Sequence, residues 1–439
     1  MSNIAAAGGK GQIQELRLIS NYSGDLNVTD GFLEMILYES VLDYSTRAHL
    51  SFVDTGYRTN KENGTAATES DDINLVSGER LEFKATDGYG QIIECKNNYQ
   101  LITDNINSVD ENVTKTIISL DFSSQEHLSN NFVKTRLTKR YEGKISDSVS
   151  RILKEFTKKQ VDIDSTLNEF CFLGNNEKPF YKIPWLAKKS VPDIPGAKSN
   201  LAGYFFYETF YDGVFGGYKF KSIDKLWTNP PKRKIIYNNK DDTPVGYTGK
   251  IFSYSFNNSL SVDKMAKLGV FSNPILKKFD PITNERTVTE MSDTDRLKVN
   301  YMGGLEPPKI ASHLDFWNTA TRISEVMTDR GVLPPGTNLK DQLKFLDQYN
   351  FNQEEILRQS YTRYNNLFNV KLSATIAGDF GIHAGDIIEC HFAEVSSKQN
   401  KVVSNKKSGL YMVIDVAHRI HANGYYTTLN LARESIYKK

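Results

Sequence analysis

Cysteine is scarce in this chain of 439 residues, which contains only Cys95, Cys171 and Cys390. The three lie far apart in the sequence. An odd, widely spaced set cannot form the disulfide framework of a small secreted domain. The sequence therefore predicts a protein that folds in a reducing cytosol.

An excess of charge of one sign is also missing, because 54 Lys and Arg residues face 53 Asp and Glu residues. No bulk attraction to nucleic acid or to an anionic membrane follows from this balance. No apolar run approaches the ~20 residues needed to cross a bilayer. Residues 1–11 lack the apolar core of a signal peptide and are expected to form a mobile arm. We therefore expect no membrane insertion.

Motifs for nucleotide or covalent chemistry are absent: the sequence has no phosphate-binding loop, no nucleophile elbow and no paired zinc motif. The densest set of possible metal ligands comprises His383, Cys390, His391, His418 and His421. Cys390 and His391 are neighbours, so on a strand they point to opposite faces and cannot bind one metal ion. We expect Cys390 to be buried and His391 to be solvated.

Two acid pairs, Glu79 with Glu82 and Asp386 with Glu389, could suggest the paired carboxylates of a glycosidase. Each pair follows a turn glycine in an alternating strand, where a solvated acid is the ordinary occupant. No catalytic residue, metal or cofactor is therefore predicted, and we do not expect an enzyme.

Alternation of apolar and polar residues dominates the first quarter of the chain, up to about residue 124, as in Leu33, Met35 and Leu37. Period 2 marks strands with one buried face, and clusters of Gly with Asn or Asp supply turns between antiparallel strands. The same pattern returns after Leu367. Both ends of the chain are predicted to be all β.

The middle of the chain has mixed character. Residues 145–156 carry an apolar stripe at helical spacing, with Ser146 and Asp147 as cap candidates. Aromatic residues flank a Gly-rich turn at 204–221 and predict a hairpin. Further elements are expected as a strand at 250–256 and helices at 339–346 and 352–367.

Four short blocks recur in the same order in the two β regions. The second block reads glycine, acid, two residues, Glu and an apolar residue in both copies. The matched blocks are 49–51 with 371–373, 78–83 with 385–390, 99–102 with 411–414, and 116–120 with 427–431. The shared order favours an internal duplication. The alternative is that two unrelated antiparallel domains reuse Gly-acid turns.

A duplicated β unit has a geometric use. Three chains with two similar units each give a ring of six units, which can match a hexameric ring to a trimeric one. The glycines at the turns, Gly56, Gly78, Gly378 and Gly385, are the residues we single out. Turns that require positive φ fix strand register, although these could also be ordinary loop glycines.

Three segments carry a resemblance to a known family: 372–390 (LSATIAGDFGIHAGDIIEC), 409–433 (GLYMVIDVAHRIHANGYYTTLNLAR) and 204–223 (YFFYETFYDGVFGGYKFKSI). The sequence resembles the central baseplate hub protein of T-even-like contractile-tailed bacteriophages and, more distantly, the N-terminal hub part of type VI secretion spike proteins. The resemblance spans most of the chain in element order and is weakest over 263–350.

The resemblance implies an α+β, β-rich fold with two similar antiparallel, barrel-like tube domains and inserted α+β collar domains. The implied divisions are 12–125 for the first tube domain, 126–236 for an α+β collar domain, 237–262 with 366–439 for a discontinuous second tube domain, and 263–365 for a second collar insertion with helices.

The implied function is that of a structural hub in a phage tail baseplate. Such hubs are homotrimers whose pseudo-hexameric ring joins the tail tube to the central spike and leaves a channel for DNA. The expected partners are the tail tube protein, the central spike protein and other baseplate proteins, with DNA only in transit. The expected location is the virion tail baseplate, after assembly in the host cytoplasm.

Two alternatives stay open, namely a tail-associated cell-wall or polysaccharide hydrolase and a receptor-binding tail protein. The hydrolase would need convergent carboxylates in a cleft, and the receptor binder an exposed aromatic patch at a distal tip. A DNA channel must avoid holding phosphates. The hub hypothesis therefore predicts that the inward-facing strand residues of 12–125 and 366–439 are neutral or negative on balance.

Overall fold

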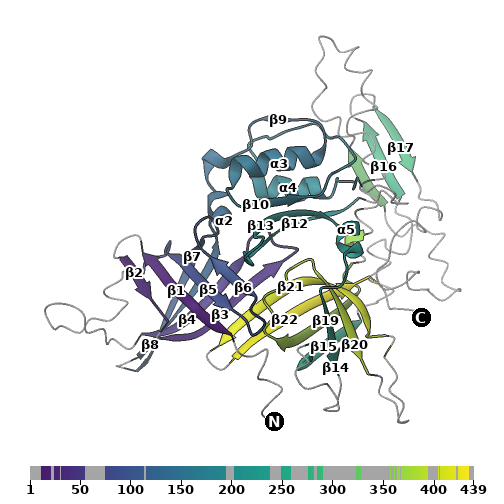
Figure 1. Ribbon diagram of the computed structural model, residues 1–439. Helices are drawn as coiled ribbons and strands as arrows, with labels where there is room; N and C mark the ends of the chain where they lie inside the picture. Colours follow the sequence, from purple (N-terminus) through teal and green to yellow (C-terminus); the bar gives the residue numbers. More distant parts are fainter. Residues whose placement is uncertain are drawn as a thin grey trace.

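Strands dominate the computed structural model of the protein (Figure 1). It describes residues 11–20, 24–29, 31–54, 75–112, 115–193, 202–237, 249–258, 275–280, 284–289, 323–327, 356, 360, 363–365, 367–393, 404, 406–421 and 424–434. The largest sheet has 14 strands, and most of its pairs are antiparallel. The expected β-rich, antiparallel character is confirmed. Within the described ranges, no helix is long and apolar enough to cross a membrane.

The large sheet draws its strands from both ends of the chain. Those from the N-terminal part are β1 (Gln12–Ser20), β2 (Gly24–Asn27), β3 (Phe32–Ser40), β4 (Arg47–Asp54), β5 (Arg80–Thr86), β6 (Ile92–Cys95), β7 (Leu101–Asn112) and β8 (Lys115–Ser124). Those from the C-terminal part are β14 (Arg233–Tyr237), β15 (Ser253–Asn258), β19 (Val370–Ala377), β20 (Ile387–Phe392), β21 (Gly409–His421) and β22 (Gly424–Arg433).

The pairing path of the large sheet runs β15-β19-β22-β21-β3-β4-β8-β7-β5-β1-β2. The two parts of the chain meet where β21 pairs with β3, so one continuous sheet crosses from the yellow to the purple strands of Figure 1. The path is open at both ends, and the described strands form no closed barrel.

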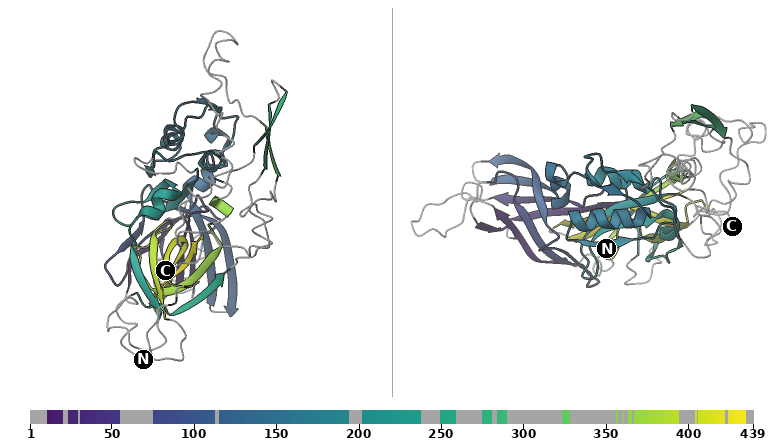
Figure 2. Two further views of the ribbon diagram at one scale, coloured as in Figure 1. Left: turned by 90° about the vertical axis from the view of Figure 1, so that its right-hand side faces the viewer. Right: turned by 90° about the horizontal axis from the view of Figure 1, so that it is seen from above.

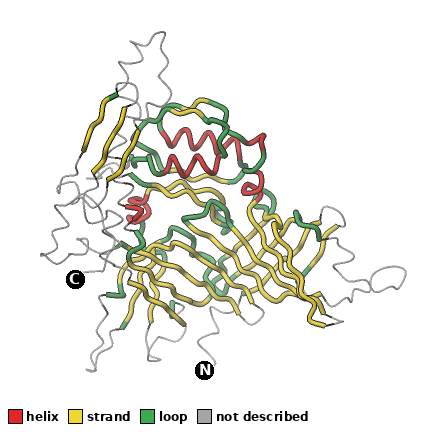
Figure 3. Tube along the Cα trace, turned by 180° about the vertical axis from the view of Figure 1, so that it is seen from behind, coloured by secondary structure: helices red, strands yellow, loops and turns green. Residues whose placement is uncertain are grey.

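An α+β unit separates the two sets of strands in the sequence. Its elements are α2 (Gln125–Ser129), η1 (Val133–Thr135), β9 (Arg140–Tyr141), α3 (Ile145–Phe156), β10 (Gln160–Ile163), β11 (Phe172–Leu173), α4 (Pro179–Ala187), β12 (Tyr204–Thr209), β13 (Gly217–Ser222) and α5 (Ile223–Thr228). The sheet β10-β13-β12 lies between helices α3 and α4 and the large sheet (Figures 1 and 3). Figure 2 shows this unit on one side of the molecule.

The predicted helix and aromatic hairpin of this unit are both confirmed, since α3 spans the apolar stripe and β12 pairs antiparallel with β13. The predicted caps are wrong. The N-cap of α3 is Lys144, which makes no side-chain cap bond. Ser146 lies inside the first turn, where its N–H donates to Thr166 Oγ1 at 3.0 Å. The hydroxyl of Thr166, from outside the helix, therefore takes the place of a local cap.

A separate sheet, β17-β16-β18, is formed by β16 (Ile275–Asp280), β17 (Glu285–Thr289) and β18 (Ile323–Met327). The helix expected at 339–346 lies outside the described residues. Of the helix expected at 352–367, the described residues 356, 360 and 363–365 are helical. The strand expected at 250–256 is β15, which begins three residues later.

Apolar side chains gather in several clusters. One consists mainly of residues from β1 to β8, including Leu50 and Leu120. A second lies within the α+β unit. A third consists of residues from the C-terminal strands, among them Ile235 of β14, together with Ile251 and Ile382. A fourth, containing Val41, Phe205 and Ile414, joins residues from all three regions. The large sheet thus buries one face against these clusters, and most of its other face is open except near Met412 and Ala432, which belong to the fourth cluster.

Candidate functional site

The first Gly-acid turn precedes β5 and is held by a short set of hydrogen bonds. Gly78 has φ of 94°, in the left-handed region that favours glycine. Its N–H donates to the carbonyl of Thr103 at 3.0 Å, and the N–H of Thr103 donates to the carbonyl of Glu79 at 2.9 Å. The carboxylate of Glu79 accepts from the N–H of Val76 at 2.8 Å.

The second Gly-acid turn precedes β20 and repeats each of these features. Gly385 has φ of 87°. Its N–H donates to the backbone carbonyl of Val413 at 2.8 Å. The N–H of Val413 in turn donates to the backbone carbonyl of Asp386 at 2.8 Å. The carboxylate of Asp386 accepts from the N–H of His383, again three residues earlier, at 2.9 Å. A Cβ at Gly385 would lie 2.3 Å from the hydroxyl of Tyr207, so space as well as φ restricts this position.

The other two glycines singled out in the sequence differ from these. Gly378 has no left-handed φ, contrary to the sequence argument. Its constraint is the close approach of Tyr425, because an added Cβ would lie 2.7 Å from the Cβ of that residue. Gly56 lies outside the described residues.

The turns define two corresponding sets of strands in the large sheet. The first strand set is β3, β4, β8, β7 and β5, and the second strand set is β15, β19, β22, β21 and β20, each given in pairing order. Both hairpins contain a register irregularity at the same place, between Thr103 and Asn105 in β7 and between Val413 and Asp415 in β21. The second set therefore repeats the pairing of the first, including its bulge.

The pairing corrects three of the four sequence matches by two residues. With the turns superposed, Thr103 corresponds to Val413, so Leu101 corresponds to Tyr411 rather than to Val413. The other two strand blocks shift by the same amount, and only the Gly-acid block is aligned as predicted. A slip of two residues keeps every side chain on its own face, so alternation alone could not detect the error.

The open face of the sheet, here called the polar face, crosses eight strands from β15 to β7. Residues directly opposite one another on paired strands share a face. Ala377, Ala432, Met412 and Ser123 also lie on this face and are buried. Its other described side chains include Ser253, Ser255, Asn257, Lys371, Ser373, Thr375, Tyr426, Thr428, Asn430, Asp415, Ala417, Arg419, His421, Glu34, Ile36, Tyr38, Ser40, Arg47, His49, Ser51, Val53, Ile117, Ser119, Asp121, Asn105, Asn107 and Val109.

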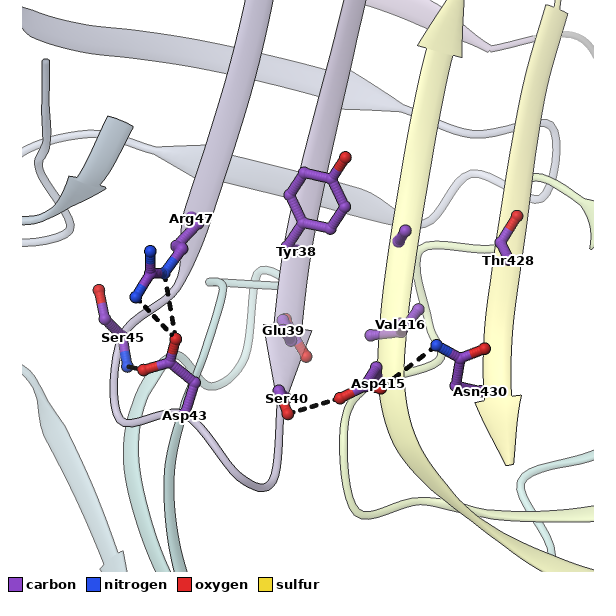
Figure 4. A pocket seen from close by; sticks show the side chains of 11 residues that line it. Tyr38, Glu39, Ser40, Asp43, Ser45, Arg47, Asp415, Val416, Thr428 and Asn430 are labelled. Carbon is purple, nitrogen blue, oxygen red and sulfur yellow. Dashed lines mark hydrogen bonds and ion pairs between the residues drawn. The ribbon is translucent and has the colours of Figure 1, made fainter. Parts of the chain in front are cut away.

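Hydrogen bonds cross the polar face at the junction of the two strand sets (Figure 4). The hydroxyl of Ser40 donates to Asp415 at 2.6 Å, and the amide of Asn430 donates to the same carboxylate at 3.2 Å. In the first strand set the amide of Asn105 donates to Asp121 at 3.3 Å. Asn and Asp have exchanged strands, because Asn105 occupies the place of Asp415 and Asp121 that of Asn430. Each set thus places one Asn-Asp pair immediately after its bulge.

The charges of the polar face nearly balance. Three cations, Lys371, Arg419 and Arg47, accompany three anions, Asp415, Glu34 and Asp121. Arg419 pairs with Glu34 at 2.5 Å, and Asp121 lies 2.7 Å from a ring nitrogen of His49. Lys115, at the tip of the β7–β8 hairpin, has the same parity as Ile117 and adds one positive charge at the end of this face. The face is close to neutral, and Ser and Asn are its most frequent residues.

A buried junction on the other side of the sheet ties three parts of the chain together. Glu39 of β3 accepts from His383 Nδ1 at 2.9 Å and from the N–H groups of Phe210 and Ala384 at 2.8 and 3.1 Å. The other ring nitrogen of His383 lies 3.6 Å from Asp212. This three-way junction joins the first strand set, the second Gly-acid turn and the aromatic hairpin.

The ionisation of the junction follows from its buried carboxylates. Burial alone would lower the pKa of His383, but Glu39 and Asp212 outweigh it and raise that pKa to about 9. Burial would raise the pKa of Glu39, and the His383 charge reverses this and lowers it. Burial lowers the pKa of the neighbouring His418 to about 4, so that ring is neutral. His383 is therefore a buried imidazolium at neutral pH.

A second buried ion cluster links the α+β unit to the first strand set. Lys159 lies against the carboxylates of Glu208 and Glu126, the latter at 2.6 Å. Glu208 also accepts from the N–H of Thr46, the residue before β4, at 2.9 Å. Burial opposes the charge on Lys159, but the two carboxylates raise its pKa to about 12. These ion clusters fix how the parts of the chain pack.

The possible metal ligands from the sequence do not converge. Cys390 is buried, whereas His391 is partly exposed and lies 2.7 Å from Glu389, so the expected opposite orientation is confirmed. His418 contacts Thr427 instead. Among the described residues, no group of three or more His, Cys, Asp or Glu side chains could hold a metal ion.

The acid pairs likewise have separate structural partners. Glu79 and Asp386 accept turn N–H groups, as described above. Glu82 lies 3.2 Å from Arg17 on the neighbouring strand β1. Neither pair lines the pocket of about 590 Å³ beside Ser255 and Lys371, nor the two smaller pockets of about 260 and 280 Å³.

Comparison with known proteins gives a result at the level of the fold. No family model and no curated protein matches the sequence. A tail protein from Neisseria meningitidis MC58 aligns with a TM-score of 0.52 and 10% identity, over 96% of this chain and 97% of that chain. The 43 kDa tail protein of prophage MuSo2 from Shewanella oneidensis aligns with a TM-score of 0.50 and 10% identity, over 96% and 98%. The chain therefore has the fold of these two tail proteins, and the resemblance found in the sequence is confirmed at that level.

Proposed function

We propose that this chain is the structural hub of a phage tail baseplate. Three copies would form a pseudo-hexameric ring that joins the tail tube to the central spike and leaves a channel for DNA. The observation that carries the proposal is the repetition of one five-strand pairing order, with its turn and its bulge, within a single chain. Two strand sets per chain give six per trimer. The fold shared with two tail proteins supports a place in the tail.

The proposed division of the chain follows the strand sets. Residues 12–125 would form one tube domain, and 237–262 with 366–439 the other. Residues 126–236 and 263–365 would form the collar domains. The apolar clusters support this division, because the residues of each cluster come mainly from one of these regions, apart from the fourth, which lies where the regions meet.

The polar face is proposed to line the channel. Eight strands per chain contribute to it, which makes 24 in a trimer. With strands ~4.8 Å apart and tilted ~40°, the backbone diameter would be roughly 48 Å. A lining that is close to neutral, with no continuous row of Lys and Arg, suits a channel for DNA, because it neutralises few phosphates and so releases few counterions.

The remaining parts of the proposal concern partners and chemistry. The ring would contact the tail tube protein, the central spike and other baseplate proteins in the virion, after assembly in the host cytoplasm. The work of the protein would be done by geometry and interfaces rather than by catalysis. Purified protein should then fail to clear a cell-wall suspension, and a chelator should leave its melting temperature unchanged.

Light scattering and electron microscopy test the assembly. The proposal predicts a particle of about 149 kDa, three times the chain mass of 49.8 kDa, and a ring with a central hole in images. A monomer at every concentration, with tube and spike partners also present, would overturn it. A trimer whose lumen carries a continuous Lys and Arg lining would overturn the DNA channel alone.

A further inference from the structure

The junction between the two strand sets provides a template for a contact between copies of the chain. The C-terminal half of β21 pairs antiparallel with β3, from Asp415 opposite Ser40 to His421 opposite Glu34. The N-terminal end of β21 pairs on the same edge with β20. Along one edge, β21 therefore pairs first with β20 of the second strand set and then with β3 of the first strand set.

The strands that correspond to these two have open edges. β7 corresponds to β21, and it pairs with β5 only at Leu101 and Ile102. Beyond Ile102, that edge of β7 has no partner among the described strands. β15 corresponds to β3, and within the same described part of the chain it pairs only with β19. The molecule thus presents one unpaired copy of each side of its internal junction.

The chemistry of both edges suits a strand partner. Soluble proteins protect sheet edges with charged residues, proline or bulges, since an open edge attracts other strands. Residues 105–109 of β7 (NINSV) and 253–257 of β15 (SYSFN) contain no charge and no proline. Val109 is 64% exposed, which is unusual for a large apolar residue in a strand. β7 has register irregularities at 103–105 and 110–112, so its open stretch is limited to 105–109. Over that stretch and over 253–257 no described strand pairs with the edge, and the backbone groups remain available for pairing.

We propose that β7 of one copy pairs antiparallel with β15 of the next copy, in the register of the internal β21–β3 junction. The inference rests on the proposed function, because it closes the same ring. It commits to a second copy of this chain as the occupant of both edges. The chain already makes this contact once, between its own two strand sets.

The register follows from the shared partners of the strands. Ile36 lies opposite His49, and Ser255 lies opposite Ser373 at the corresponding position of the second set, so Ser255 takes the place of Ile36. Arg419 lies opposite Ile36 across the internal junction.

Arg419 also lies opposite Tyr426, as Val109 lies opposite Ile117 in the other hairpin. Val109 therefore takes the place of Arg419. The contact between copies should accordingly place Val109 opposite Ser255 and, two residues along, Asn107 opposite Asn257.

A pair of introduced cysteines tests this register in the full-length protein. In Val109→Cys combined with Ser255→Cys, the two thiols would lie on directly opposite residues, within reach of a disulfide. Mild oxidation should give covalent dimers and trimers on a denaturing gel. The native cysteines do not compete, because all three are buried. A second pair, Asn107→Cys with Asn257→Cys, tests the same register at another position.

The matched control combines Val109→Cys with Asn257→Cys. These two residues are diagonal neighbours, two residues out of register, and their Cα atoms would lie ~7–8 Å apart. The yield of disulfide cross-links should therefore fall at least tenfold relative to the directly opposite pair. If every variant is a ring-shaped trimer and neither opposite pair cross-links, the register is wrong and the proposed hub stands. If the unmodified protein is monomeric under all conditions, the hub proposal falls and takes this inference with it.

Discussion

Replacing His383 by Gln tests the three-way junction, because it removes the buried cation that faces Glu39 and Asp212. The nearest charges are those two carboxylates, with Lys219 acting weakly against the imidazolium. Gln is of similar size and can still donate a hydrogen bond to Glu39. The substitution therefore removes charge while it disturbs packing little.

The expected magnitude follows from the pKa. A rise from 6.5 to about 9 corresponds to about 3 kcal/mol, since one pKa unit is about 1.4 kcal/mol. Because the folded pKa lies above the unfolded one, this contribution is fully present below pH 6.5 and is lost as the pH rises through about 9. The wild-type free energy of unfolding should fall across this window by an amount of that order.

Guanidinium unfolding at pH 6.5 and pH 9.5, at one fixed protein concentration, measures the effect. At pH 6.5 the variant should be less stable by about 3 to 5 kcal/mol, because a buried carboxylate loses its partner. At pH 9.5 the two proteins should converge. His49→Gln is the matched control, since its pair with Asp121 is partly exposed and should contribute no more than about 1 kcal/mol. An equal pH-dependent loss in wild type and H383Q would refute the reasoning.

Three further predictions concern single residues. Gly385→Ala should lower the free energy of unfolding by about 3 kcal/mol or more, because both φ and the nearby Tyr207 oppose a Cβ there. Gly90 has a similar φ but open space around it, so Gly90→Ala should lower the free energy of unfolding by only about 1 to 2 kcal/mol. Similar losses in the two variants would show that Tyr207 does not restrict position 385. Stability should fall as the pH drops from 6.5 towards 4, because the depressed pKa of His418, about 4, lies below its unfolded value. In a pH series of unfolding curves, His418→Gln should make that fall smaller, and the fall that remains belongs to carboxylates with a lowered pKa such as Glu39; an unchanged fall would contradict this account. Arg363→Met should lower the free energy of unfolding, measured in denaturant, by about 3 to 5 kcal/mol, because the buried Asp224 carboxylate loses both of its hydrogen bonds from Arg363. Arg151→Met on the surface of α3 should lower it by less than about 1 kcal/mol. Equal losses in the two variants would contradict this account.

Period-2 patterning predicted the strands well and their alignment poorly. The strands around Leu50 and Leu120 were predicted from alternation, and both lie in the apolar cluster of the first strand set. The matches across the chain, however, were two residues out in three blocks, because a two-residue slip changes no face. Only the block with a glycine at positive φ was aligned correctly. A conformational requirement at one position fixes a register that a repeating pattern cannot.

The three-way junction was missed, although one signal pointed to it. Glu39 has the same parity as Leu33, Met35 and Leu37, so the alternation of β3 already assigned it to the buried face. A buried carboxylate needs a partner. Its partner His383 lies 344 residues away in the sequence, and no local pattern connects the two. The sequence could have predicted that Glu39 is paired, but not with which residue.

The exchanged Asn-Asp pairs of the polar face gain a meaning in the proposed ring. In each strand set one amide donates to one carboxylate immediately after the bulge, with Asp121 on β8 in the first set and Asp415 on β21 in the second. Exchanging the two residues keeps the hydrogen bond and moves the negative charge by one strand, ~4.8 Å. A trimer would therefore carry six such carboxylates, spaced alternately three and five strands apart around its channel. With Lys371, Arg419 and Arg47 spread between them, the face stays close to neutral overall, yet each strand set retains a fixed negative point that repels phosphate. This arrangement depends on both copies of the strand set being present in every chain, and on the bulge lying at the same place in each.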